Sequence, residues 1–219
     1  MIMITAFIEP SAAVPYSDQA TTILDLMMKG GIIMIPIVLL SLVTFYIFIE
    51  RMAYIRRTTA IEKGLIPSVM GDIRDGNRNN AILRARNNQA AVGRILESGL
   101  EKTGKSQEEI EKNLETITNL EITKMEKNTG YLGIIAGVAP MLGFIGTISG
   151  VIKIFYNISL ADNISIGIIA GGLYQKMICS GAGLIVGVLA YAAYHYIQMR
   201  IDRYTIRLQE SLIQFLKAF

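Results

Sequence analysis

The 219-residue sequence has no tryptophan, one cysteine and one histidine, so several kinds of functional site lack candidate residues. Cys179 lies in an apolar run and has no second cysteine with which to form a disulfide, so it says nothing about redox compartment. The charged stretch 51–128 contains no histidine, no cluster of metal ligands and no glycine-rich phosphate loop. We therefore expect no metal, no cofactor and no enzymatic activity.

Carboxylates are absent from two long stretches, between Glu126 and Asp162 and from residue 163 to 201. The composition is 52% hydrophobic and the mean hydropathy is +0.42, with the charges gathered in blocks. A net charge of +3 is too small and too unevenly placed to indicate a nucleic-acid partner. These values are typical of a small membrane protein.

Three apolar stretches predict an all-α integral membrane protein with three transmembrane helices, whose long second and third helices extend into the cytoplasm. Residues 30–49 carry no charge, and twenty helical residues span about 30 Å, the thickness of the hydrocarbon core. The predicted spans are residues 30–50, 129–156 and 164–197. Pro36 is expected to bend the first span.

Basic residues follow the first and third spans, and they predict the orientation. Arg51, Arg56, Arg57 and Lys63 follow the first span, whereas only Lys29 precedes it. The positive-inside rule then places the N-terminus in the periplasm and the C-terminus in the cytoplasm. The remaining predicted segments are a periplasmic segment 1–29 with a short amphipathic helix from residue 17, a cytoplasmic helical region 51–128, a periplasmic loop 157–163 and a cytoplasmic C-terminal helix 198–219.

Residues 1–13 lack a basic n-region and include Glu9 and Pro10, so we expect no cleaved signal peptide. In the predicted cytoplasmic region, Ser106 and Glu109 form a capping-box pattern at the start of a helix. A second apolar face there is expected to combine Ile82, Leu83, Val92, Ile95, Leu96 and Leu100. His195 lies beside three tyrosines at the end of the third span, where we expect an interfacial contact rather than a proton relay.

The second span sorts its side chains onto two faces at 100° per residue. One face is small, with Gly133, Ala136, Ala139, Pro140, Gly143, Gly146, Thr147 and Gly150. The other is large and apolar, with Ile134, Met141, Ile145, Ile148 and Ile152. Small residues let helix backbones approach closely in membranes, so the first face predicts tight helix packing. The Thr147 hydroxyl either serves function or bonds back to a carbonyl one turn earlier.

The third span divides in the same way, but its small face is also polar. That face holds Gly172, Gln175, Lys176, Cys179, Ser180, Gly183, Gly187 and Ala190, opposite Met177, Ile178, Leu184, Ile185, Val188 and Leu189. A lysine and a glutamine inside a span are costly unless they face protein or water. This face is therefore the first candidate for a functional site.

Two segments resemble the signatures of the ExbB/TolQ proteins, within the wider MotA/TolQ/ExbB group. Residues 138–150, VAPMLGFIGTISG, resemble the second-span signature, and residues 172–177, GLYQKM, with Ser180 after them, resemble the third. The resemblance implies a homo-pentamer whose second and third helices line a pore. It also implies that an ExbD/TolR-type single-span partner occupies this pore, and that proton flow drives a TonB-like or TolA-like protein.

By position, Thr147 and Ser180 match pore-facing hydroxyls of that family, with Ser180 where threonine is usual. Gln175 stands where many members have glutamate, and glutamine cannot bind and release a proton near neutral pH. The resemblance thus implies a pore and proton pathway lined by Thr147, Gln175 and Ser180. The titrating carboxylate is then expected on the partner's helix.

Lys176 leaves several interpretations open. It pairs with a partner carboxylate, is hydrated in a vestibule, or loses its proton through burial; alternatively the span begins at Met177 and Lys176 extends outward to the interface. Lys176 and the glycines Gly143, Gly150, Gly183 and Gly187 are candidate contacts to other subunits or to the partner.

The predicted function is an ExbB-like stator subunit of a proton-driven motor in the bacterial inner membrane, surrounded by lipid, that energises TonB-dependent outer-membrane transport. A TolQ-like role in envelope integrity and division is an alternative that the sequence does not separate from it. A stand-alone ion or solute pore is a second alternative. A third is a structural scaffold, in which Thr147, Gln175 and Ser180 only form interhelical hydrogen bonds.

Overall fold

The computed structural model describes residues 31–59, 64–160 and 166–216, and this part of the chain is helical without a β-strand. The helices are α2 (Met34–Thr58), α3 (Leu65–Arg74), α4 (Arg78–Asn87), α5 (Ala91–Glu101), α6 (Gln107–Glu126), α7 (Thr129–Ser159) and α8 (Ile166–Leu216). The predicted amphipathic helix within residues 1–29 lies outside the described residues. Of the predicted loop 157–163, residues 157–159 belong to the end of α7, and residues 161–163 lie outside the described residues.

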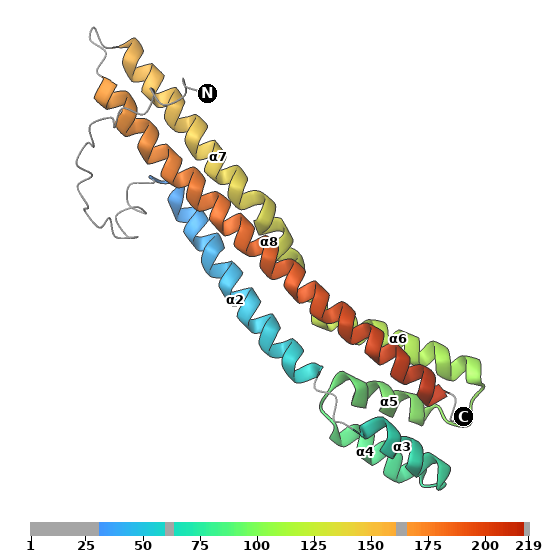
Figure 1. Cartoon of the computed structure of the whole chain (residues 1–219). Helices are drawn as coiled ribbons and strands as arrows, with labels where there is room; N and C mark the ends of the chain where they lie inside the picture. Colours follow the sequence, from blue (N-terminus) through green and yellow to red (C-terminus); the bar gives the residue numbers. More distant parts are fainter. Residues whose placement is uncertain (1–30, 60–63, 161–165, 217–219) are drawn as a thin grey trace, which may run out of the picture.

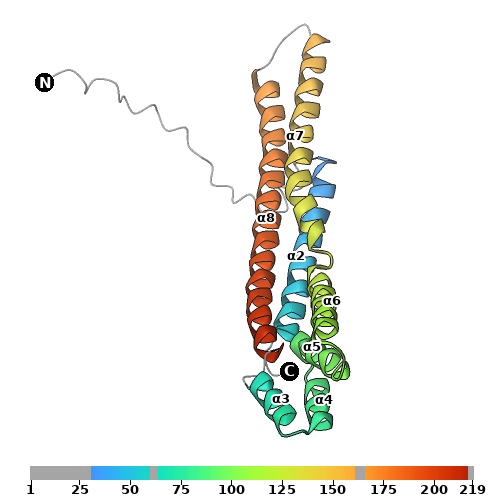
Figure 2. The ribbon, with the colours of Figure 1, turned by 90° about the vertical axis from the view of Figure 1, so that its right-hand side faces the viewer.

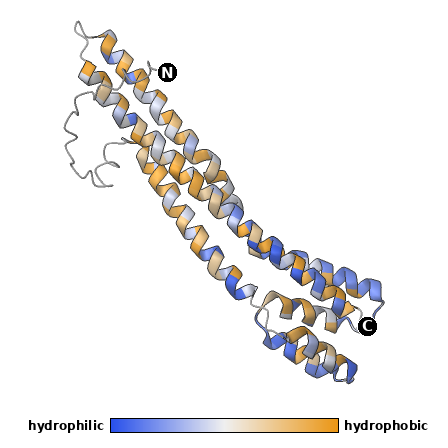
Figure 3. Cartoon of the chain, in the orientation of Figure 1, coloured by the Kyte–Doolittle hydropathy of each residue, from blue (hydrophilic) through white to orange (hydrophobic). Residues whose placement is uncertain are grey.

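Three long helices pack side by side in the apolar half: α7 lies along the first part of α8, and α2 packs against both (Figures 1 and 2). The described residues contain three helical segments long and apolar enough to cross a membrane, which confirms the predicted all-α fold with three candidate spans. Figure 3 shows that apolar residues dominate one half of the molecule, while polar residues gather around α3–α6 and the C-terminal end of α8. The boundary between these halves lies near the end of α2.

Helix α8 connects the two halves without a break. Its 51 residues span roughly 75 Å at 1.5 Å per residue, and they cover both the predicted third span and most of the predicted C-terminal helix. In the apolar half α8 packs against α7 and α2, and in the polar half against α6 and α3. One rigid element therefore links the membrane part to the polar helices.

The second long helix is interrupted where it leaves the apolar half. Asn128 has a left-handed backbone with φ of 65°, so α6 and α7 are separate helices. Asparagine tolerates this conformation better than most residues. The Thr129 hydroxyl donates a hydrogen bond of 2.7 Å to the carbonyl of Glu126. This bond satisfies one of the carbonyl groups left without a helical partner at the C-terminal end of α6. The helix is thus broken at this level, whereas α8 runs past it as one continuous helix.

The core of the polar half forms mainly around α5 and α8. Ile95, Leu96 and Leu100 of α5 are fully buried, together with Leu208 and Phe215 of α8. The prediction that one apolar face combines residues of α4 and α5 is wrong at Leu83, whose side chain is 53% exposed. A turn between Asn87 and Ala91 separates the two helices, so α4 instead buries the smaller Ala81 and Ala85.

The predicted N-cap of α6 is confirmed. The Ser106 hydroxyl accepts a hydrogen bond of 3.3 Å from the backbone N–H of Glu109, and the apolar residues Ile110, Leu114 and Met125 of this helix are buried. The cap satisfies one of the free N–H groups at the helix start. This places α6 with its apolar face towards α5 and α8.

Glu121 is a buried carboxylate within this polar core, 2% exposed. It accepts hydrogen bonds from Arg94 of α5 and from Lys124 Nζ, the latter at 2.7 Å. Burial alone would raise the pKa of the Glu121 carboxyl, but the hydrogen bonds and charges of Arg94 and Lys124 hold it below its ordinary value. The ion pair between Arg94 and Glu121 therefore links α5 to α6.

Glu121→Gln is expected to destabilise the polar half by about 1–3 kcal/mol, because charge-assisted hydrogen bonds are lost from a buried site. The pKa of Glu121 is lower in the folded than in the unfolded chain. Its contribution to the free energy of unfolding is therefore complete above the unfolded-state pKa and is lost as pH falls through the folded-state pKa. Thermal unfolding followed by circular dichroism at pH 7 and pH 3 measures both effects. A difference between variant and parent that is as large at pH 3 as at pH 7 would contradict this role.

Candidate functional site

The small face of α7 packs directly onto α8. Ala139, Gly143, Gly146 and Gly150 are buried along this contact. The opposite face is exposed, as predicted, at Ile134, Met141, Ile145, Ile148 and Ile152. Gly133, which the projection put on the small face, is exposed at the rim of the contact near Tyr194. The two-faced pattern read from the sequence is therefore confirmed over most of its length.

Helix α8 meets this face with its own small residues. Cys179, Gly183, Gly187 and Ala190 are buried. The large residues of the other arc are exposed, namely Met177, Leu184, Ile185, Val188 and Leu189. The small face of α8 thus lies against α7 of the same chain.

Backbone atoms of the two helices approach closely at the glycines, and we call this contact the α7–α8 seam. A Cβ atom added to Gly183 would lie 2.6 Å from the Ala139 carbonyl oxygen, and one added to Gly143 would lie 3.0 Å from Ser180 Cα. A Cβ on Gly187 would lie 2.5 Å from the Pro140 ring. A side chain at Gly183 or Gly187 would overlap the neighbouring helix, and one at Gly143 would require its neighbour to shift by a few tenths of an ångström. The contact made by Gly143, Gly150, Gly183 and Gly187 is within one chain, and their contact to other subunits stays a prediction.

Thr147 lies half-buried on the seam. Its hydroxyl donates to the Gly143 carbonyl at 3.1 Å, one turn earlier on α7, and the Lys176 carbonyl of α8 is a longer second acceptor at 3.5 Å. The hydrogen bond to a carbonyl one turn earlier, one of the two roles predicted for this hydroxyl, is thus present. The oxygen still has acceptor capacity for water or a partner group.

The other two predicted pore residues lie on the neighbouring part of α8. Ser180 is half-buried, and its backbone packs on Gly143. Gln175 is helical and lies five residues before Ser180, and its side chain is outside the described residues. The backbone therefore brings Ser180 beside the turn of α7 that precedes Thr147.

Lys176 crosses the seam with its aliphatic stem. Its Cγ, Cδ and Cε lie against Gly150 so closely that a side chain there would overlap them. Its Nζ lies 3.7 Å from the position of a Cβ on Gly31, just before α2 begins. No described carboxylate forms an ion pair with it. The ammonium group is therefore level with the start of α2.

Two hydrogen bonds mark the opposite end of the apolar half, where α6 ends and α7 begins. The Arg51 guanidinium donates to the Lys124 carbonyl at 3.2 Å, and the Gln198 amide donates to a Glu126 carboxylate oxygen at 3.2 Å. From Gly31 to Arg51, and from Lys176 to Gln198, each helix rises about 30 Å, the thickness of a hydrocarbon core. This geometry favours the alternative in which Lys176 lies at one boundary of the span and extends outward.

Arg51, which the sequence analysis used only as a charge that indicates orientation, makes a buried structural contact. It is 5% exposed, pairs with Glu50 and reaches a carbonyl in the last turn of α6. It therefore joins the first span to the start of the second. A sequence offers no signal for this contact, because the partner is a backbone oxygen 73 residues away.

These features define a class: an all-helical membrane protein whose second and third spans form one tightly packed hairpin. A family model described as the MotA/TolQ/ExbB proton channel family matches residues 87–210, more than half of the chain. The chain therefore belongs to the MotA/TolQ/ExbB proton channel family. The matched region runs from the end of α4 through most of α8 and includes the whole seam.

Relatives in this family carry ExbB and TolQ names. A protein of Methanothermobacter thermautotrophicus named as an ExbB homolog is 28% identical over 185 residues, which cover 83% of this chain and 64% of that protein. The Tol-Pal system protein TolQ of Haemophilus influenzae is 29% identical over 84 residues, 38% of this chain and 37% of that protein. Salmonella typhimurium ExbB is 25% identical over 92 residues, 42% and 38% respectively. Each alignment covers less than two thirds of the relative's length.

Two alanine substitutions in α8 test the seam. Gly183→Ala is expected to destabilise the chain in detergent by about 1–3 kcal/mol, because the new Cβ overlaps the Ala139 carbonyl. Gly181→Ala is the matched control, since nothing lies within 4 Å of its Cβ position and alanine is the better helix former. Thermal unfolding of both variants checks this, and equal stability of the two would show that the seam is not closely packed.

Lys176→Met is expected to leave folding and assembly unchanged, because methionine keeps an apolar stem over Gly150 and the ammonium has no carboxylate partner among the described residues. Circular dichroism of the purified protein measures folding, and size-exclusion chromatography measures assembly. Loss of assembly with retained folding would instead indicate that Lys176 contacts another subunit or a partner.

Proposed function

We propose that the chain is an ExbB-like stator subunit of a proton-motive-force-driven motor in the bacterial inner membrane. With an ExbD-type partner it energises TonB-dependent transport across the outer membrane. The observation that carries the proposal is the family match over the whole α7–α8 seam, in a hairpin whose described spanning residues include no carboxylate. A proton-driven complex built from this chain needs an acid from elsewhere.

Protons would pass along a polar path that includes Thr147, Gln175 and Ser180. The half-buried hydroxyl of Thr147 and the position of Ser180 beside the same stretch of α7 support this assignment. None of the three titrates near neutral pH, so they would hydrogen-bond water while the partner's carboxylate binds and releases the proton.

Assembly into a homo-oligomer, a pentamer by family resemblance, is part of the proposal. The large apolar residues of α7 and α8 face away from the seam and are available for lipid or for neighbouring subunits. The ExbD/TolR-type helix would occupy the centre, and a TonB-like or TolA-like protein would receive the motion. Membership of the family and the ExbB and TolQ names of the relatives support these proposed partners.

The proposed orientation has the N-terminus in the periplasm and the polar half, including the C-terminal end of α8, in the cytoplasm. Arg56 and Arg57 of α2 and three arginines of α8 lie at the polar end of these helices, and the positive-inside rule favours the cytoplasm for this end. Lys176 would then lie at the periplasmic boundary.

A TolQ-like role is the second candidate, because Haemophilus influenzae TolQ matches 38% of this chain, close to the 42% matched by Salmonella typhimurium ExbB. The two roles are separated by complementation. The chain and its one-span partner are expressed together in a strain lacking its own ExbB and ExbD, and in one lacking TolQ and TolR. Energised uptake through a TonB-dependent receptor is the expected result, and restored detergent resistance without uptake would favour TolQ. Neither phenotype being restored would contradict both.

Thr147→Val is expected to lower energised uptake about tenfold or more, since the hydroxyl that orders water on the path is lost. Thr147→Ser retains the hydroxyl and should keep most of the activity. Thr123→Val is a control, because that exposed hydroxyl on α6 bonds only to its own helix. Uptake rates normalised to membrane protein level make the comparison, and full activity of Thr147→Val would remove Thr147 from the path.

A further inference from the structure

A cleft of about 270 Å³ lies between the ends of α2 and α8, and arginines dominate it. Arg56 comes from α2, and Arg200, Arg203 and Arg207 come from successive turns of α8. The spacing of three and four residues puts the three α8 arginines on one face of the helix. All four side chains are exposed around the cleft, while Tyr204 and Ile55 form its buried floor.

These arginines differ from others in the described part of the chain. Arg51, Arg84, Arg86 and Arg94 each form an ion pair with a carboxylate. The four cleft arginines form none with a described acid. The Arg200 guanidinium lies over the Tyr196 ring, 5.6 Å from its centroid. Asp202 and Glu210 are exposed on the same helix but do not line the cleft. Four unpaired cations in one cleft repel one another unless an anion joins them.

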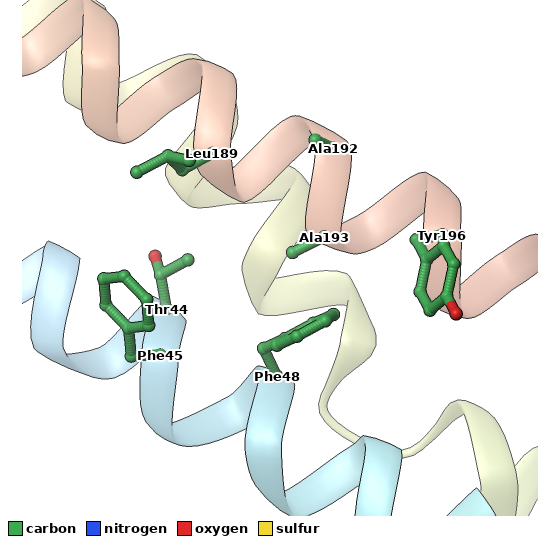
Figure 4. Close-up of a pocket in the computed structure, with 7 residues that line it drawn as sticks. All are labelled: Thr44, Phe45, Phe48, Leu189, Ala192, Ala193 and Tyr196. Atoms are coloured by element: carbon green, nitrogen blue, oxygen red, sulfur yellow. The ribbon is translucent and has the colours of Figure 1, made fainter.

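The cleft continues along the same two helices into an apolar groove. Figure 4 shows this groove, a cavity of about 350 Å³ whose lining includes Thr44, Phe45, Phe48, Leu189, Ala193 and Tyr196. Phe48 lies one turn before Met52 on α2, and Tyr196 lies one turn before Arg200 on α8, so the groove and the cleft share the same faces. One continuous surface is apolar at one end and cationic at the other.

This surface lies across the boundary between the apolar and polar halves. The apolar groove is within the charge-free part of α2, which ends at Ile49, and the cationic cleft begins after it. Tyr196 stands at the junction, the position that tyrosine prefers at a membrane interface. An acyl chain and a phosphate meet at this same depth in a phospholipid leaflet.

We propose that the groove between α2 and α8 binds one anionic phospholipid. Its acyl chain lies against Phe45, Phe48 and Ala193, and its phosphate lies among the four arginines. Guanidinium groups match phosphate oxygens in a bidentate geometry, and a second anionic group on the headgroup supplies further charge. The site is independent of the proton path, because none of its residues lies on the α7–α8 seam.

The test measures binding of defined lipids to the purified chain in detergent by native mass spectrometry. Dioleoylphosphatidylglycerol is the anionic probe, dioleoylphosphatidylcholine has the same chains with a zwitterionic headgroup, and inorganic phosphate has no chain. We expect the anionic lipid to bind at least about tenfold more tightly than phosphatidylcholine, since each basic residue near an anionic headgroup contributes. Equal affinity for both lipids, or phosphate bound as tightly as the anionic lipid, would overturn the proposal.

Adjacent arginines of α2 provide matched variants. Arg56→Gln should weaken binding of the anionic lipid about fivefold, and Arg56→Gln with Arg203→Gln should abolish its preference over phosphatidylcholine. Arg57→Gln removes the same charge beside the cleft without lining it, and should leave affinity within about twofold. Equal effects of Arg56→Gln and Arg57→Gln would show general charge attraction instead of a site.

Ala193→Phe narrows the apolar groove without changing charge and is expected to weaken both lipids alike. If this variant changes the oligomeric state while anionic-lipid binding is unchanged, a neighbouring copy occupies the groove and the proposal is wrong. Circular dichroism confirms that each variant is folded, and the comparison of lipids on the unaltered chain needs no variant.

Discussion

The structure depends on one close contact, the approach of the α7 and α8 backbones along their glycines. A Cβ on Gly183 would lie 2.6 Å from a carbonyl oxygen of α7, so this packing exists only where side chains are absent. In a bilayer, where water exclusion between helices contributes little, such packing is what holds two spans together. The contact also holds Thr147 beside the α8 backbone and lays the Lys176 stem over Gly150. Because α8 continues without a break, the same helix carries this geometry into the polar half.

A tightly closed hairpin without acids constrains the function. The described parts of α7 and α8 supply hydroxyls and backbone carbonyls but no carboxylate within the apolar half, so this chain would guide protons rather than bind them. Lys176, the one cation on the polar face of the third span, lies level with the first residues before α2. With this level as the proposed membrane boundary, the covered stem and the outward ammonium lower the cost of placing a lysine in this stretch. The proposed division of labour leaves the proton-binding step to the partner.

Much of this architecture was predictable from the sequence, because bilayer-length apolar runs and small-residue faces are local patterns. The two faces of α7, with Gly143 and Ile145 on opposite sides, followed from the helical period alone, as did the cap at Ser106. The Asn128 break was not predicted, since a single asparagine is too weak a signal to locate a left-handed residue. The bond from Arg51 to the Lys124 carbonyl and the arginine cleft were missed because they join residues far apart in sequence. Leu83 shows the same limit. Its hydrophobicity predicted that it would be buried on a face shared with α5, but the turn after α4 separates the two helices and leaves Leu83 exposed.

Proton flux in proteoliposomes tests the central claim most directly. The chain is reconstituted alone, with its one-span partner, and with a partner in which every carboxylate of the span is neutralised to the amide, under an imposed pH gradient read by an internal pH dye. The account predicts background flux from the chain alone, added flux with the intact partner, and a return to background with the neutralised one. Full flux from the chain alone, or from the complex with the neutralised partner, would contradict it.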